Sequence, residues 1–100
     1  MNPQFKKGAL ELCVLAQLSS NDKYGYELTE TISENLSVAA GTLYLILKRL
    51  KDSGYLETYL VESQSGPARK YYHLTDEGRS YKENLKADWL DFVKKVGELI

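Results

Sequence analysis

The stretch "GTLYLILKRLKDSGYLE", from Gly41 to Glu57, decides the fold of this chain. Its apolar residues return at i, i+3, i+4 and i+7, which is the spacing of one buried face of an α-helix. The buried stripe is expected to consist of Leu43, Ile46, Leu47 and Leu50. At about 100° per residue, the opposite side carries Gly41, Leu45, Lys48, Arg49 and Asp52. Gly54, just beyond, is placed to take the left-handed conformation that ends a helix.

Two further helices are expected before this stretch. The first covers about residues 3–19 and is apolar almost all round, which indicates burial on more than one side. The second, "YGYELTETISENL", covers residues 24–36, and Asp22 is its expected N-cap. A break of a few residues leads to the third helix, at about residues 39–53, for which Ser37 is the nearest capping residue. Two helices joined by so short a turn outline a helix-turn-helix.

The pattern then changes to one typical of strands. The segments "YLETYLV" at residues 55–61 and "RKYYHLT" at residues 69–75 are rich in Tyr, Val and Thr, which favour strands. Alternation places Arg69 and Lys70 on opposite faces of the second strand. The intervening cluster, with a tip at residues 63–68, predicts a hairpin whose loop is longer than the tightest turns. Such a projecting hairpin is the wing of a winged helix-turn-helix.

A last helix is expected to begin after Thr75, a good N-cap, and to run nearly to the end of the chain. Its apolar residues follow the 4-3-4-3 spacing of a heptad seam, which favours pairing with a second copy of the same helix. The expected dimerisation residues are Leu85, Trp89, Phe92, Val96 and Leu99. The predicted fold class is therefore mainly α with a small β-hairpin. We expect residues 1–75 to form a winged helix-turn-helix DNA-binding part and residues 76–100 a dimerisation helix, within one structural domain.

Composition agrees with a single folded domain, because the chain has 100 residues, of which 43% are hydrophobic and 27% charged. The net charge is −1, but residues 41–82 hold seven Lys or Arg against five acids, so the middle segment has the positive excess. The apolar runs are too short to span a bilayer. Two lysines precede an apolar stretch at the N-terminus, as in a signal peptide, but Glu11 and Gln17 interrupt that stretch and no clean cleavage site follows. A cytoplasmic location is therefore expected.

Three motifs, "YGYEL", "GTLYLILKRLKDSGYLE" and "SGPARKYYHLTDEG", occur in this order and spacing. Together they resemble the PadR family of transcriptional regulators, over roughly residues 8–80. The resemblance implies a homodimer that binds operator DNA and usually represses transcription. If both recognition helices of such a dimer enter the major groove on one face of double-stranded DNA, the operator is expected to be roughly palindromic. It also implies dimerisation through the C-terminal helix.

The candidate DNA-binding residues come from two elements. The N-terminal part of a recognition helix contacts base edges in the major groove, and a wing holds the DNA backbone or minor groove beside it. From the helix, the candidates are Thr42, Tyr44, Leu45, Lys48 and Arg49. From the wing, they are Ser65, Gly66, Arg69 and Lys70.

Trp89 has two interpretations. Its place on the heptad seam favours a residue of the dimer core. The resemblance to PadR-like multidrug-responsive regulators implies instead that Trp89 and Phe92 bind a small aromatic effector.

The alternative to a DNA-binding repressor is a winged-helix protein-interaction module. An enzyme is not expected, because the sequence holds no nucleophile–base pair, phosphate-binding glycine loop or metal-ligand set. No cofactor is expected either.

Overall fold

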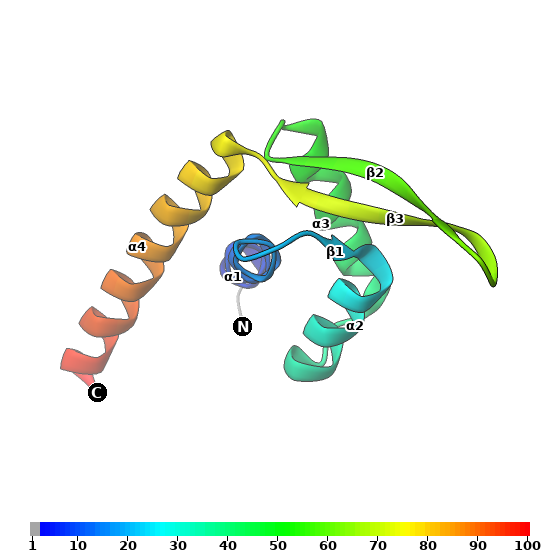
Figure 1. Ribbon diagram of the computed structural model, residues 1–100. Coiled ribbons are helices and arrows are strands. Elements are labelled where there is room, and N and C mark those ends of the chain that lie inside the picture. The colour runs from blue at the N-terminus through cyan, green and yellow to red at the C-terminus, as the bar shows by residue number, and fades with distance from the viewer. Residues whose placement is uncertain (1–2) are drawn as a thin grey trace.

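The computed structural model describes residues 3–100, with side chains described from residue 7 onward. Four helices and three strands follow one another in the chain (Figure 1). They are α1 (Pro3–Gln17), β1 (Lys23–Tyr24), α2 (Gly25–Leu36), α3 (Ala40–Asp52), β2 (Leu56–Ser63), β3 (Gly66–Leu74) and α4 (Asp76–Leu99). This arrangement confirms the predicted fold class.

The core lies where α1, α2 and α3 meet the inner face of the sheet. Figure 1 shows α1 end-on, with α4 on one side and α2 and α3 on the other. The stripe predicted for α3 is fully buried. Helix α1 packs against α4 on one side and against α2 and α3 on the other (Figure 1), as its apolar composition predicted. The buried hydrophobic residues are Leu10, Val14, Leu15, Leu18, Leu28, Ile32, Val38, Leu43, Ile46, Leu47, Leu50, Leu56, Tyr72 and Leu74.

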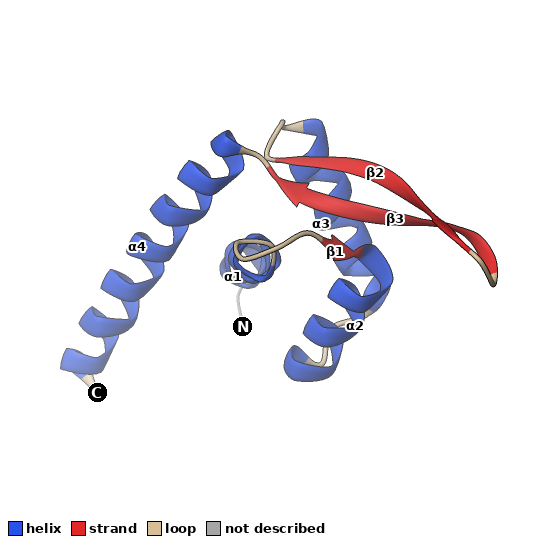
Figure 2. Ribbon diagram, in the orientation of Figure 1, coloured by secondary structure: helices blue, strands red, loops and turns tan. Residues whose placement is uncertain are grey.

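The sheet has three antiparallel strands in the order β1-β3-β2 (Figure 2). Strand β1 was not predicted, because two residues are too short for an alternating pattern. It pairs Tyr24 with Tyr71, so the expectation that the second helix begins at Tyr24 is wrong. The Tyr24 ring instead stacks on Tyr71, with the ring centroids 6.0 Å apart.

The two expected capping residues have other roles. Helix α2 begins after Tyr24 without a side-chain cap, and Asp22 binds side chains of the sheet instead. Ser37 ends α2 in the left-handed conformation, with φ 53°. Helix α3 then begins after Ala39, again without a side-chain hydrogen bond. Both assignments were wrong because other residues directly precede the helices: Tyr24 precedes α2, and Ala39 precedes α3.

The hairpin is longer and its turn tighter than predicted. Strands β2 and β3 pair from Leu56 and Leu74 out to Ser63 and Gly66, which leaves only residues 64–65 in the turn. The register shifts by one residue between Val61 and Ser63, as in a β-bulge. The paired part of the wing therefore reaches almost to its tip.

Helix α4 is joined firmly to the body at its first turn and then leaves it. Thr75 is the N-cap, as predicted, and its hydroxyl accepts a hydrogen bond from the Gly78 amide at 3.0 Å. Gly54 has φ +84°, which confirms its predicted role after α3. Tyr81 and Leu85 pack on the core, whereas residues 90–100 are all exposed. Within residues 3–100, no helix combines the length and apolar character needed to cross a membrane.

Candidate nucleic-acid interface

The exposed side of α3 is clearly separated from its buried side. Its core stripe is at most 3% exposed, whereas Leu45 is 64% exposed. All five α3 candidates are exposed side chains, as the helical spacing predicted: Thr42, Tyr44, Leu45, Lys48 and Arg49. The helix thus presents cations, hydroxyls and one leucine on a single surface.

Lys48 lies in the middle of this surface and is paired along the helix. Its Nζ lies 2.9 Å from Asp52 Oδ2, one turn later. The hydrogen bond to Asp52, followed by the negative charge of that carboxylate, raises the pKa of Lys48. Both side chains are mostly exposed, so the pair is screened by water and contributes little to folding stability.

Thr42 and Arg49 lie on the flank of α3 that faces α1. They line a cleft of about 440 Å³ together with Lys7 of α1 and the turn at residues 37–39. Lys7 is a second cation at this cleft that the sequence did not indicate. The sequence of α1 alone does not predict that its N-terminal turns lie beside α3, because this contact depends on tertiary packing.

Tyr44 lies on the other flank and leans toward α2 and the sheet. With Tyr26, Glu30 and other residues of α2, it lines a groove of about 330 Å³. Burial raises the pKa of Tyr72 in β3, and the nearby Tyr44 phenol raises it further. The Tyr44 side chain therefore lies partly on the exposed surface of α3 and partly in the groove beside α2.

The wing candidates are separated by the alternation of β3. The Arg69 guanidinium lies 5.1 Å from the centre of the Tyr24 ring, on the outer face of the sheet. Lys70 has the opposite parity, the same as the core residue Tyr72. Ser65 and Gly66 are exposed at the tip, where the Ser65 amide donates a 3.4 Å hydrogen bond to the Ser63 hydroxyl. The wing therefore offers one cation on each face.

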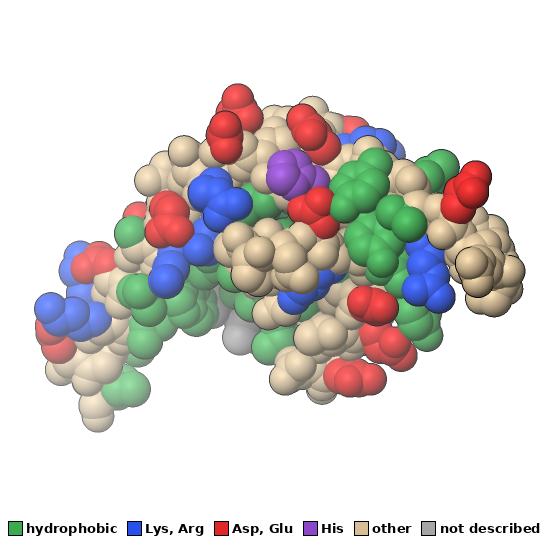
Figure 3. All heavy atoms as spheres, viewed as in Figure 1, with side chains coloured by type: hydrophobic (Ala, Val, Ile, Leu, Met, Phe, Trp, Pro, Cys, Tyr) green, Lys and Arg blue, Asp and Glu red, His purple; other side chains and the backbone are tan. Residues whose placement is uncertain are grey.

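A cluster that the sequence did not predict ties the wing to the body. Tyr59 Oη donates a 2.6 Å hydrogen bond to Asp22, and His73 Nδ1 lies 2.7 Å from the other oxygen of that carboxylate. The hydrogen bonds from Tyr59 and then from His73 lower the pKa of Asp22. Figure 3 shows the single histidine beside an acidic side chain and a hydrophobic patch, while further acidic side chains gather over α2. On this face, Lys and Arg side chains are interspersed with the acidic ones (Figure 3).

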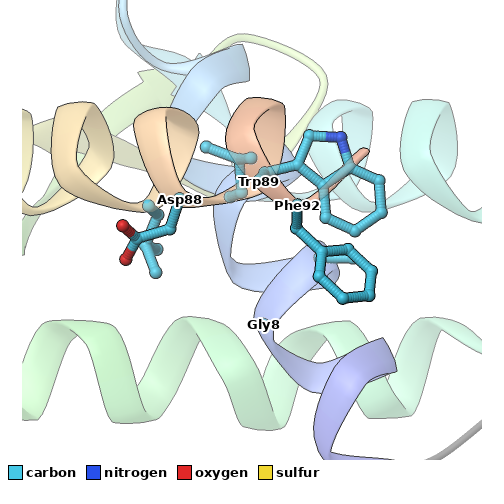
Figure 4. A pocket seen from close by; sticks show the side chains of 7 residues that line it. Gly8, Asp88, Trp89 and Phe92 are labelled. Carbon is cyan, nitrogen blue, oxygen red and sulfur yellow. The ribbon is translucent and has the colours of Figure 1, made fainter. Parts of the chain in front are cut away.

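A groove between α1 and α4 contains the predicted ligand residues. Trp89 and Phe92 extend from α4 over the first helix near Gly8 (Figure 4). The groove measures about 220 Å³ and is also lined by Ala9, Leu12, Leu85 and Asp88. That volume is below the roughly 300–1,000 Å³ typical of small-molecule sites. The groove of one chain is therefore smaller than a typical small-molecule site.

The heptad residues of α4 differ in their surroundings. Leu85 packs partly on the core of its own chain, and Trp89 is half-buried, while the seam beyond them is exposed at Phe92, Val96 and Leu99. Leu90 and Val93 are exposed apolar residues that lie off the predicted seam. Their exposure became visible only once the packing of α4 on α1 was known.

Among the residues that the structure describes, no three His, Cys, Asp or Glu side chains are grouped to hold a metal ion. Cys13 is half-buried in α1, and burial raises the pKa of its thiol. The exposed surface of α3 and the wing carry all of the predicted DNA-binding candidates.

Comparison with known proteins points the same way. The family model described as the transcriptional regulator PadR-like family matches residues 14–84. The transcriptional regulator Rv3488 of Mycobacterium tuberculosis is 35% identical over 80 residues, which cover 77% of this chain and 72% of that protein.

Solved structures resemble this one over nearly the whole chain. A PadR-like transcriptional regulator from Bacillus cereus has 37% identity and a TM-score of 0.84, covering 96% of this chain and 95% of the other. A Streptococcus transcriptional regulator has 33% identity and a TM-score of 0.87, with 98% of each chain covered.

Proposed function

This chain belongs to the PadR-like family of transcriptional regulators, and on that premise we propose that it is a homodimeric repressor that binds a roughly palindromic operator in double-stranded DNA. Members of the family are regulators rather than enzymes, and PadR-like regulators bind DNA. A cytoplasmic location, beside the DNA, follows from this proposal.

The observation that carries the proposal is the exposed surface of α3. Lys48 and Arg49 supply positive charge for phosphates or guanine, and the hydroxyls of Thr42 and Tyr44 supply donors for phosphates or base edges. Leu45 is exposed among them. With α3 in the major groove, these five side chains make the principal contacts.

The wing supplies the flanking contacts. Lys70 and Arg69 neutralise phosphates on either face of the hairpin, and the backbone at Ser65 and Gly66 approaches the adjacent groove. Because Arg69 stacks over Tyr24, its charge is held at a fixed place relative to the sheet.

Dimerisation through α4 accounts for the apolar surface that the helix exposes. Phe92, Val96 and Leu99 are exposed on one side of it, and a facing copy would cover them. Trp89 continues this seam, and Leu85 contributes at its edge. Two α3 helices presented on one side of a dimer fit half-sites about 34–36 Å apart.

An effector response is the least direct part of the proposal. The groove at Trp89 and Phe92 is apolar and partly formed by one chain, so the facing copy would complete a pocket for a flat aromatic compound. Quenching of tryptophan fluorescence by planar aromatic compounds tests this part. Trp89 is the single tryptophan, so the signal reports on this groove alone.

The experiment that tests the main proposal is DNA binding at two salt concentrations. The operator fragment is first selected from a random DNA pool with the wild-type protein. Lys48→Ala and Arg69→Ala should each weaken binding and lower the slope of log K against log salt by about 0.9 for one lost phosphate contact.

Lys94→Ala is the matched control, because Lys94 is exposed on α4 opposite the heptad seam. It should leave both the affinity and the slope unchanged. Failure of the wild-type protein to retain any duplex would favour the alternative function, a protein-interaction module with the same fold.

A further inference from the structure

Leu45 is unusual among the residues of α3 because it is apolar and 64% exposed. One turn before it stands Gly41, and a Cβ added there would meet nothing within 4 Å. Helical side chains lean toward the N-terminus of their helix, so Leu45 covers the surface next to Gly41. It is therefore the apolar group that protrudes from the N-terminal half of the exposed side, where a recognition helix meets base edges.

The surroundings of Leu45 indicate a charged partner. One turn later stand Lys48 and Arg49, both exposed. An apolar protein surface would require a contiguous apolar patch, whereas Leu45 has a bare glycine on one side and cations on the other. A polyanion with a small apolar group at one place fits this arrangement.

Base-pair edges in the major groove offer few apolar groups. They present hydrogen-bond donors and acceptors, apart from the C5-methyl group of thymine. A leucine placed against a polar edge would desolvate that edge without replacing its hydrogen bonds, which is unfavourable. Placed against a methyl group, it removes apolar surface of both partners from water, which is favourable.

We propose that Leu45 reads a thymine in each half-site of the operator through contact with its C5-methyl group. This inference rests on the proposed function and adds a base preference to it. The operator then contains a thymine at one fixed position in each half, opposite the N-terminal half of α3. 5-Methylcytosine presents the same methyl group, but thymine is the partner that we assign.

The test is a scan in which deoxyuridine replaces each thymine of the selected operator in turn. Uracil lacks only the C5-methyl group, so pairing and charge stay the same. At one thymine per half-site, the replacement should weaken wild-type binding about fourfold, as expected for one buried methyl group. Leu45→Ala should bind the thymine operator and the uracil operator with equal affinity at that position. Replacement of that thymine by 5-methylcytosine tests whether the methyl group alone suffices; tighter binding than to cytosine is expected there.

Leu60→Ala is the matched control, since Leu60 is a leucine of similar exposure, 67%, on β2. It should keep the preference for thymine. The inference is overturned if every uracil is tolerated, if Leu45→Ala keeps the wild-type preference, or if Leu60→Ala loses it. In each of these cases the protein still binds DNA, so the proposed function stands. Absence of binding to every duplex would remove both.

Discussion

Gly78, in the first turn of α4, packs directly against the backbone carbonyl of Tyr55, at the residue before β2. The same junction is held by Thr75, whose amide donates to the Tyr55 carbonyl at 3.1 Å and whose hydroxyl donates to the Gly54 carbonyl at 2.8 Å. The start of α4 is therefore fixed to the segment that follows α3.

This contact predicts that Gly78→Ala destabilises the fold. A Cβ at this position would overlap the backbone oxygen, which cannot move aside as a flexible side chain can. We expect the free energy of unfolding to fall by about 1–3 kcal/mol, the usual cost of overpacking. Gly97→Ala is the control, because position 97 of α4 is open, and it should gain up to about 1 kcal/mol from helix propensity. Equal effects in urea denaturation would contradict the prediction.

Tyr81 links α4 to α1, and its hydroxyl ionises at a higher pH than an ordinary tyrosine. Its hydroxyl donates to Glu11 at 2.8 Å, and its ring stacks on Tyr55 with centroids 4.2 Å apart. Burial, followed by the hydrogen bond to Glu11, raises the pKa of Tyr81 to about 12. A raised pKa favours the neutral phenol in the folded state, so its contribution to stability is full below pH 10.0 and is lost as the pH rises through about 12.

We therefore expect the wild-type stability to decline between pH 10.0 and about 12 more steeply than that of Tyr81→Phe. Phenolate absorbance during alkaline titration should show the loss of one late-ionising tyrosine in the variant. In Glu11→Gln, Tyr81 keeps an acceptor but loses the charge beside it, so its pKa should fall partway toward the ordinary value. A tyrosine titration curve that Tyr81→Phe leaves unchanged would refute the assignment.

Asp22 should control the ionisation of Tyr59. Its carboxylate accepts the Tyr59 hydrogen bond, which is the main cause of the raised pKa of Tyr59. Asp22→Asn should bring the pKa of Tyr59 back toward 10.0, measured by NMR of the tyrosine ring. Glu57→Gln removes the carboxylate that pairs with His73 across β2 and β3, and it should change the pKa of Tyr59 less than Asp22→Asn does.

Asp22 also gives the acid dependence of folding a definite sign. The pKa of Asp22 is lowered in the folded state. Its contribution to folding stability is therefore present above pH 3.8 and is lost as the pH falls through the folded pKa. Below pH 3.8, the wild type should lose stability faster than Asp22→Asn. Parallel acid denaturation curves for the two proteins would argue against the link between Asp22 and the wing.

Removal of Asp52 is expected to strengthen DNA binding. The carboxylate lies 2.9 Å from Lys48 Nζ on the proposed contact surface, where it holds the cation and repels phosphates. Asp52→Asn should raise the affinity for the selected operator, because it removes a negative charge beside the phosphates. The number of phosphate contacts is unchanged, so the slope of the salt dependence should stay close to that of the wild type. Asp91→Asn breaks the equivalent 2.9 Å pair with Lys95 on α4 and should change neither quantity. Weaker binding by Asp52→Asn would place the interface elsewhere.

A charge on the exposed seam of α4 should prevent dimerisation. Val96→Asp buries a carboxylate without a partner in the proposed dimer core, which is strongly unfavourable. We expect sedimentation of wild type as a dimer and of the variant as a monomer at micromolar concentration. Lys94→Asp introduces the same residue on the opposite side of the helix and should remain dimeric. A wild-type mass of one chain would exclude the proposed assembly.

The helices could be predicted because their stabilising interactions are local in sequence. Leu43, Ile46, Leu47 and Leu50 recur at helical spacing, and they are all buried in α3. Thr75 was identified as a cap because the capping hydroxyl serves an amide three residues later. Features of this kind are visible in a few consecutive residues.

The contacts between distant segments were not predictable in the same way. Asp22 lies next to a helix start, which suggested a cap, yet its partners stand 37 and 51 residues away. Lys7 reaches the cleft beside Arg49 only through the packing of α1 on α3. The candidate residues of α3 were located as exposed by their spacing, whereas their roles in DNA binding stay predictions.

Because Gly78 packs against the Tyr55 carbonyl, α4 is fixed at its first turn, close to the end of α3, and any tilt of the helix pivots about this point. Its 24 residues extend about 36 Å at about 1.5 Å per residue. A tilt of about 5° moves the far end by about 3 Å, close to the ~3.4 Å rise of one base pair. In a dimer that pairs through the C-terminal ends of α4, the stiffness of the contact between Gly78 and Tyr55 therefore determines how far the distance between the two α3 helices can vary. It thereby determines how many half-site spacings the dimer can bind.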